Sequence, residues 1–85
     1  MSVHKAITEL FESRYEARKK YLQLDKKREQ AIEQVLEQAK NSLPFTTTKI
    51  NQITNEMNLL AKKYNLPPRK NVTKEMVWEY VKKKS

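Results

Sequence analysis

The side chains of this 85-residue chain that are best suited to chemistry are basic, and they are concentrated in two segments. Residues 14–28 hold seven Lys and Arg against two acidic residues, and residues 62–85 hold eight against two. Basic patches attract phosphates and release their counterions, so each segment is a candidate contact for nucleic acid or another polyanion. Exposed Lys-rich faces also keep small helical proteins soluble, and this simpler interpretation stays open. The proposed polyanion contacts are Arg14, Arg18, Lys19, Lys20, Arg69, Lys70 and Lys74.

The sequence contains few of the residues that common catalytic mechanisms require. Gly and Cys are both absent, which argues against Gly-rich phosphate loops, thiolate nucleophiles and thiolate zinc sites. His4 is the only histidine, and we interpret it as a solvated residue. Glu29, Glu33 and Glu37 form a row with four-residue spacing, but without a histidine among them we interpret the row as surface. We therefore expect no enzyme activity, no cofactor, and no catalytic or metal-binding residues.

One long helix is predicted over residues of about 2–41. This stretch contains neither Pro nor Gly and is rich in good helix formers, and Pro44 disfavours helical geometry just after it. Apolar or long-stemmed residues recur at alternating steps of four and three, which is heptad spacing with two arginines in the seam. The seam consists of Val3, Ile7, Leu10, Arg14, Ala17, Tyr21, Leu24, Arg28, Ala31 and Val35.

Two shorter helices are predicted over about 47–63 and 74–84, with signals at their ends. Thr46 and Thr73 have the side-chain oxygens that cap helix starts. Asn65 suits a left-handed helix end where Gly is missing. Together the three helices predict an all-α fold, and we expect residues 1–85 to form a single helical domain.

The third helix is broadly apolar, and we expect it to close the core. Its large side chain Trp78 is interpreted as a core anchor, and Met76, Val77, Tyr80 and Val81 are expected to be buried with it.

The lengths of the three helices do not match. A helix of about 40 residues is roughly 60 Å long, whereas the other two would be roughly 27 Å and 15 Å. They should pack over the C-terminal end of the first helix, leaving apolar residues near its start without cover. Either a second copy covers them, or the helix breaks near Asp25 and folds back; the lack of Gly and Pro there favours an unbroken helix and a homodimer. The expected dimer contact is Val3, Ile7, Leu10 and Phe11.

An uncharged polar face is predicted on the second helix, unlike the Lys- and Glu-rich surfaces elsewhere. Asn51, Asn55 and Asn58 lie along it at steps of four and three, together with Gln52 and Thr54. Such a face can receive a partner, although it is more often solvated.

Several short motifs resemble a family of short uncharacterised proteins of Bacillus-type bacteria. They are Val3-His4-Lys5-Ala6-Ile7, Ile50-Asn51, Leu60-Ala61, Arg69-Lys70, Val72-Thr73-Lys74-Glu75-Met76-Val77 and Glu79-Tyr80-Val81. The resemblance spans nearly the whole chain and implies a bacterial cytosolic protein, without assigning site residues.

The role that the sequence favours is a protein–protein interaction or regulatory module, most simply a homodimer. The alternative is a nucleic-acid-binding protein that uses the basic segments 14–28 and 62–85. No apolar run approaches the roughly 20 residues of a membrane span, and charges near the N-terminus interrupt any signal-peptide pattern. We therefore expect a cytoplasmic protein.

Overall fold

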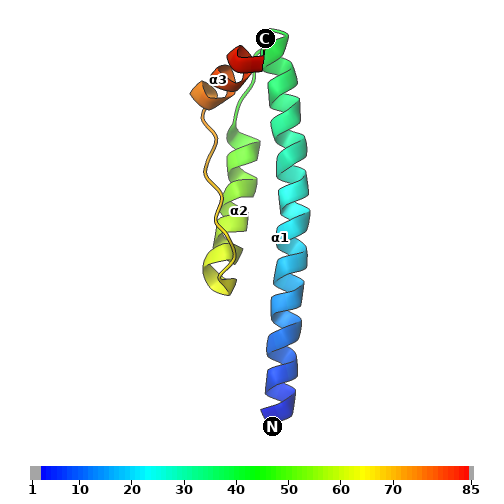
Figure 1. The fold of residues 1–85 in the computed structure, drawn as a ribbon. Helices are drawn as coiled ribbons and strands as arrows, with labels where there is room; N and C mark the ends of the chain where they lie inside the picture. The colour runs from blue at the N-terminus through cyan, green and yellow to red at the C-terminus, as the bar shows by residue number, and fades with distance from the viewer. Residues whose placement is uncertain (1–2, 85) are drawn as a thin grey trace.

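The computed structural model describes the backbone of residues 3–84 and the side chains of residues 13–83. Over the described backbone the chain forms three helices and no strand: α1 (Val3–Lys40), α2 (Thr48–Tyr64) and α3 (Lys74–Lys84) (Figure 1). The predicted all-α arrangement with a long first helix and two shorter ones is confirmed. Helix α1 runs without interruption past Asp25, so the alternative of a fold-back at that residue is wrong.

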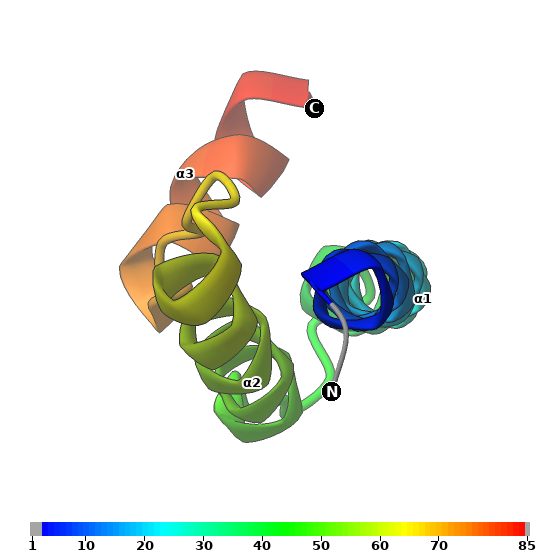
Figure 2. The same ribbon diagram turned by 90° about the horizontal axis from the view of Figure 1, so that it is seen from below.

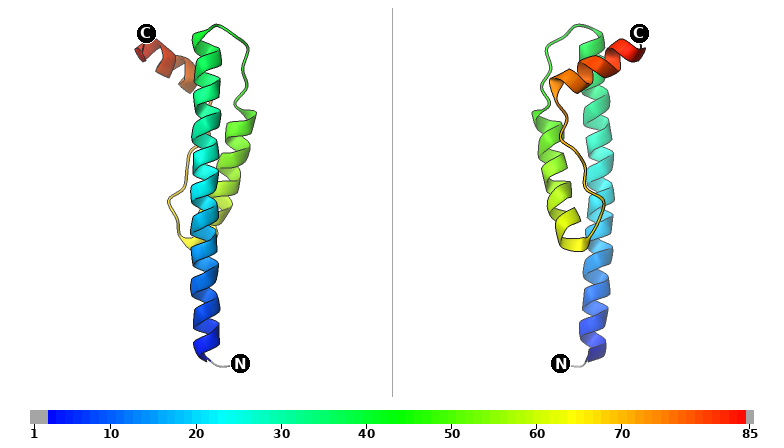
Figure 3. Two further views of the ribbon diagram at one scale, coloured as in Figure 1. Left: turned by 90° about the vertical axis from the view of Figure 1, so that its right-hand side faces the viewer. Right: turned by 60° about the vertical axis from the view of Figure 1, so that its left-hand side comes forward.

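Helix α2 runs antiparallel to α1 beside its middle and C-terminal parts, and α3 lies across the C-terminal end of α1 (Figures 1 and 3). Viewed along α1, both shorter helices lie on one side of it (Figure 2). The N-terminal part of α1 extends beyond the end of α2. The molecule measures 60 × 20 × 16 Å with a radius of gyration of 17.3 Å, against about 12 Å for a compact domain of this length. The shorter helices therefore leave part of α1 uncovered.

The core lies between the heptad seam of α1 and one face of α2, in two clusters. The seam is buried at Ala17, Tyr21, Leu24, Ala31 and Val35. The cluster nearest α3 contains Ala31, Val35, Ala39, Phe45, Ile50 and Val77, with Ile32 and Leu36 partly buried beside it. The second cluster contains Tyr21, Leu24, Met57 and Ala61.

The C-terminal ends of α1 and α2 both turn through a left-handed residue that is not Gly. Ser42 has φ 58° and Asn65 has φ 56°, so the expectation for Asn65 is confirmed. In each case the next amide, of Leu43 or Leu66, donates to a carbonyl five residues back, at 2.8 Å and 3.0 Å. These bonds satisfy carbonyls that the helix ends would otherwise leave unpaired.

The start of α2 differs from its prediction, whereas the start of α3 matches. Thr47, not Thr46, precedes α2, and it makes no capping bond because its backbone, at φ −101° and ψ 7°, is not extended. The Thr47 hydroxyl instead accepts a hydrogen bond from the Asn51 side chain. At α3, the Thr73 hydroxyl accepts from the Met76 amide at 3.2 Å, which confirms the predicted cap.

Helix α3 buries less of its apolar surface than expected. Val77 is buried, but Trp78 is 43% exposed and packs edge-on against Phe45, with ring centroids 5.5 Å apart. Met76 and Tyr80 are also exposed, and Val81 is half-buried. The expectation of a core position is therefore confirmed for Val77, while Val81 packs against the core only half-buried. It is wrong for Met76, Trp78 and Tyr80, because a short helix lying across the end of α1 turns only one narrow face inward.

Candidate functional site

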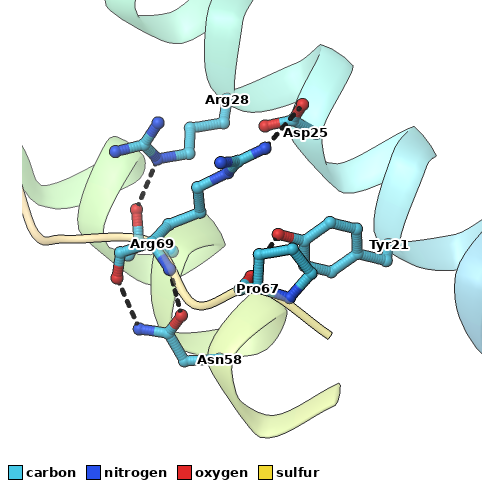
Figure 4. Close-up of polar contacts among 7 residues, drawn as sticks. Tyr21, Asp25, Arg28, Asn58, Pro67 and Arg69 are labelled. Carbon is cyan, nitrogen blue, oxygen red and sulfur yellow. Dashed lines mark hydrogen bonds and ion pairs between the residues drawn. The ribbon is translucent and has the colours of Figure 1, made fainter. Parts of the chain in front are cut away.

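The segment 66–73, which we call the strap, returns along α2 and is held there by two asparagine side chains. The Asn58 amide donates to the Arg69 carbonyl and accepts from the Arg69 amide, both at 2.8 Å (Figure 4). Asn51 makes the same pair of bonds with Val72, at 2.9 Å and 2.7 Å. Each side-chain amide thus replaces a backbone partner for one residue of the strap.

The spacing of these two clamps fits the geometry of both segments. Seven residues of helix from Asn51 to Asn58 rise about 10.5 Å. Three residues of extended chain from Arg69 to Val72 cover about 10 Å. Pro67 and the proline after it favour the extended conformation that this match requires. Asn51 and Asn58, part of the polar face expected to be solvated or to receive a partner, therefore hold the chain's own strap.

A polar cluster fixes the start of the strap to α1 (Figure 4). The Tyr21 hydroxyl donates to the Pro67 carbonyl. The Arg69 guanidinium lies 5.9 Å from the centre of the Tyr21 ring, and its Nη2 lies 3.5 Å from Oδ2 of Asp25. Arg69, predicted to contact a polyanion, is thus already engaged within the chain.

The second arginine of the heptad seam, Arg28, links α1 to both α2 and the strap. Its Nε donates to the Thr54 hydroxyl on α2 at 2.8 Å, and its Nη2 donates to the Lys70 carbonyl in the strap at 2.9 Å. The expectation that Thr54 lies on the outer polar face of α2 is wrong, because Thr54 is fully buried and donates in turn to the Ile50 carbonyl. The charged residue in the seam therefore has a structural function, which the spacing pattern alone does not reveal.

The predicted polyanion contacts do not form one continuous patch. Four of them are exposed around the C-terminal end of α2. Arg14 and Arg18 line a 390 Å³ hollow there, and Lys19 and Lys20 line a separate one of 890 Å³, which Glu16 shares. Lys74 is the first residue of α3, and α3 packs near Ile32 of α1. Ile32 lies roughly 27 Å further along α1 than Arg14, so Lys74 is far from Arg14.

The predicted dimer contact lies where only the backbone is described. The side chains of Val3, Ile7, Leu10 and Phe11 lie outside the described residues. The backbone that carries them belongs to α1 and extends past the end of α2.

Two large apolar side chains of α1 are exposed. Tyr15 is 67% exposed and Leu22 is 60% exposed. Further along, an apolar hollow of 370 Å³ opens between α1 and α3. It is lined by Glu29, Ile32, Glu33, Leu36, Val72, Met76, Val77 and Tyr80.

The described residues contain no group of three or more His, Asp or Glu that could hold a metal ion. None of the helices in that part of the chain is both long and apolar enough to cross a membrane.

Comparison with known proteins agrees with the resemblance inferred from the motifs. Residues 1–83 match the model of a family described as "Protein of unknown function (DUF2533)". The uncharacterized protein YpbS of Bacillus subtilis (strain 168) is 47% identical over 79 residues, covering 93% of each chain. No solved structure matches the chain. Neither description names a reaction, and on this match the chain belongs to the DUF2533 family.

Proposed function

We propose that this protein is a cytoplasmic protein–protein interaction module, without enzyme activity, that works as a homodimer and serves as a small adaptor or regulator. One observation carries the proposal: α1 extends beyond both shorter helices. The heptad seam continues into that extension as Val3, Ile7 and Leu10, where neither α2 nor α3 reaches it. Apolar heptad positions on a helix are stabilised by burial against another helix. Within this fold, that helix has to come from another molecule.

The first experiment measures the molar mass in solution by light scattering and by sedimentation equilibrium over a range of protein concentrations. We expect a dimer, and a strict monomer at high concentration would contradict self-association. Leu10→Asp should yield monomers with a partial loss of helical circular dichroism. Gln30→Asp, which places the same carboxylate on an exposed position of α1, is the matched control and should remain dimeric. A Leu10→Asp variant that still dimerises would remove the N-terminal contact from the proposal.

Nucleic-acid binding is a second candidate function. It is supported by the exposed Arg14, Arg18, Lys19 and Lys20, which surround the end of α2, near the exposed Lys62 and Lys63. If about five phosphates are neutralised, the logarithm of the affinity for duplex DNA or RNA should fall with the logarithm of salt concentration at a slope of about −4 to −5. Replacing Lys19 and Lys20 by Gln should reduce that slope by about two. Absence of binding at low salt would remove this candidate.

A further inference from the structure

The hollow of 390 Å³ at the C-terminal end of α2, which we call the end hollow, is lined by basic and aromatic side chains. Its volume is within the range of small-ligand pockets. The described residues that line it are Arg14, Tyr15, Arg18, Tyr64, Asn65 and Leu66, and none of them is acidic. Glu16, by contrast, lines the neighbouring hollow of 890 Å³, and two glutamates line the apolar hollow beside α3. The end hollow therefore offers cations without a carboxylate among them.

Two arginines give the end hollow its positive charge. Arg14 and Arg18 are one helical turn apart on α1, both are exposed, and within the described residues neither forms an ion pair. Arg28 and Arg69 differ, because contacts within the chain engage both of them. The C-terminal end of α2 contributes about half a negative charge, which two guanidinium groups outweigh. The end hollow should therefore attract an anion, and guanidinium groups bind the oxygens of phosphate well.

Two tyrosine rings distinguish the end hollow from an ordinary basic surface. The Tyr15 side chain is 67% exposed, and Tyr64, the last residue of α2, is half-buried. Nζ of Lys63 lies 5.5 Å from the centre of the Tyr64 ring. Exposed aromatic rings beside cations are typical of surfaces that bind single-stranded nucleic acid, because bases stack on the rings while phosphates contact the cations. A duplex keeps its bases paired and stacked on each other, so it has no free base to place on Tyr15.

We propose that the end hollow binds single-stranded nucleic acid, with one base stacked on Tyr15 and the adjacent phosphates held by Arg14 and Arg18. Tyr64 also lines the neighbouring hollow, which contains Lys19 and Lys20. A strand that passes over Tyr64 therefore meets further cations. This inference rests on the second candidate function, nucleic-acid binding, and assigns it a site and a class of strand. The homodimer proposal does not depend on it.

The stacking contact is tested by fluorescence anisotropy at low salt, with labelled single strands of about 12 nucleotides and the duplex of the same sequence. Single strands of DNA and RNA should both bind more tightly than the duplex, because both offer free bases and phosphates. Tyr15→Ala should weaken their binding about fivefold or more, since the stacked ring is lost. Tyr15→Phe keeps the ring and should bind as wild type. An Ala variant that binds as wild type, or a Phe variant as weak as the Ala variant, would overturn the inference.

The phosphate contacts are tested by the dependence of affinity on salt. Each phosphate neutralised on a single strand contributes about 0.7 to the slope of log affinity against log salt. Arg14→Gln combined with Arg18→Gln should therefore make the slope shallower by about 1.4. The matched control is Lys40→Gln combined with Lys49→Gln, which removes the same charge from exposed positions near the start of α2, at the opposite end from the hollow. Equal slopes for the two double variants would overturn the inference, because net charge and not the end hollow would then govern binding.

The duplex separates this inference from nucleic-acid binding in general. A duplex that binds as tightly as the single strands would overturn the inference and leave the second candidate function standing. Absence of binding to every oligonucleotide would overturn both. Binding to vesicles of phosphatidylglycerol without binding to oligonucleotides would assign the basic residues to a membrane surface and would likewise overturn the inference.

Discussion

Replacing Asn58 by Ala removes both hydrogen bonds that join α2 to the backbone of Arg69. Each such bond contributes about 1 kcal/mol net, so the loss is about 2 kcal/mol. Ala is a better helix former than Asn, and this offsets about 0.5 kcal/mol of the lost stability. We therefore expect the free energy of unfolding to fall by about 1.5 kcal/mol, which corresponds to a fall in melting temperature of about 6 to 12 °C. Asn55→Ala, on an exposed position of the same helix, is the matched control and should gain about 0.5 kcal/mol.

The assay is urea unfolding followed by circular dichroism, with every variant at one protein concentration because dimerisation makes stability depend on concentration. Hydrogen exchange supplies a local readout, since the Arg69 and Val72 amides both donate to asparagine side chains. In Asn58→Ala the Arg69 amide should exchange faster than in the control. If Asn58→Ala and Asn55→Ala unfold at the same urea concentration, the clamps do not stabilise the fold and the reasoning fails.

Three further substitutions, and one matched control, can be measured in the same urea assay. Thr54→Val should lower the free energy of unfolding by about 1 to 2 kcal/mol, because Nε of Arg28 loses its acceptor; an unchanged value would mean that water replaces the hydroxyl. Met57→Ala should lower the free energy of unfolding by about 2 to 5 kcal/mol because Met57 is fully buried. Leu59→Ala, on the exposed side of α2, is the control and should change it by no more than about 0.5 kcal/mol. Equal effects of the two substitutions would contradict the observed packing. Asn65→Ala should cost about 1 kcal/mol because the short polar side chain of Asn tolerates a left-handed backbone better than the methyl group of Ala does. A neutral result would mean that the Asn65 side chain does not stabilise this helix end.

The parts of the fold that the sequence predicts well depend on neighbouring residues. The stop at Pro44, the left-handed Asn65 and the cap at Thr73 are local signals, and the structure contains all three. The heptad seam likewise predicts which face of α1 is buried, because a helix places residues three and four apart on one side. The unbroken helix follows from the absence of any residue that would interrupt it.

The contacts that fix the strap could not be predicted in this way. Asn58 and Arg69 are eleven residues apart, and Arg28 and Thr54 are twenty-six apart, so no short-range pattern links them. A partial signal existed, since two asparagines seven residues apart precede a double proline. Trp78 shows a different limit of prediction from sequence. Its size indicates burial, but α3 lies across the end of α1 and leaves Trp78 partly exposed at the edge of the core.

The length of α1 affects how the molecule moves in water. A particle three times as long as it is wide meets more friction than a sphere of the same mass. A monomer should consequently leave a gel-filtration column earlier than compact standards of its own mass, at a volume easily mistaken for that of a dimer. End-over-end tumbling should also be slower than rotation about the long axis. The backbone N–H bonds of α1 lie along that axis, so their NMR relaxation should report the slower rotation.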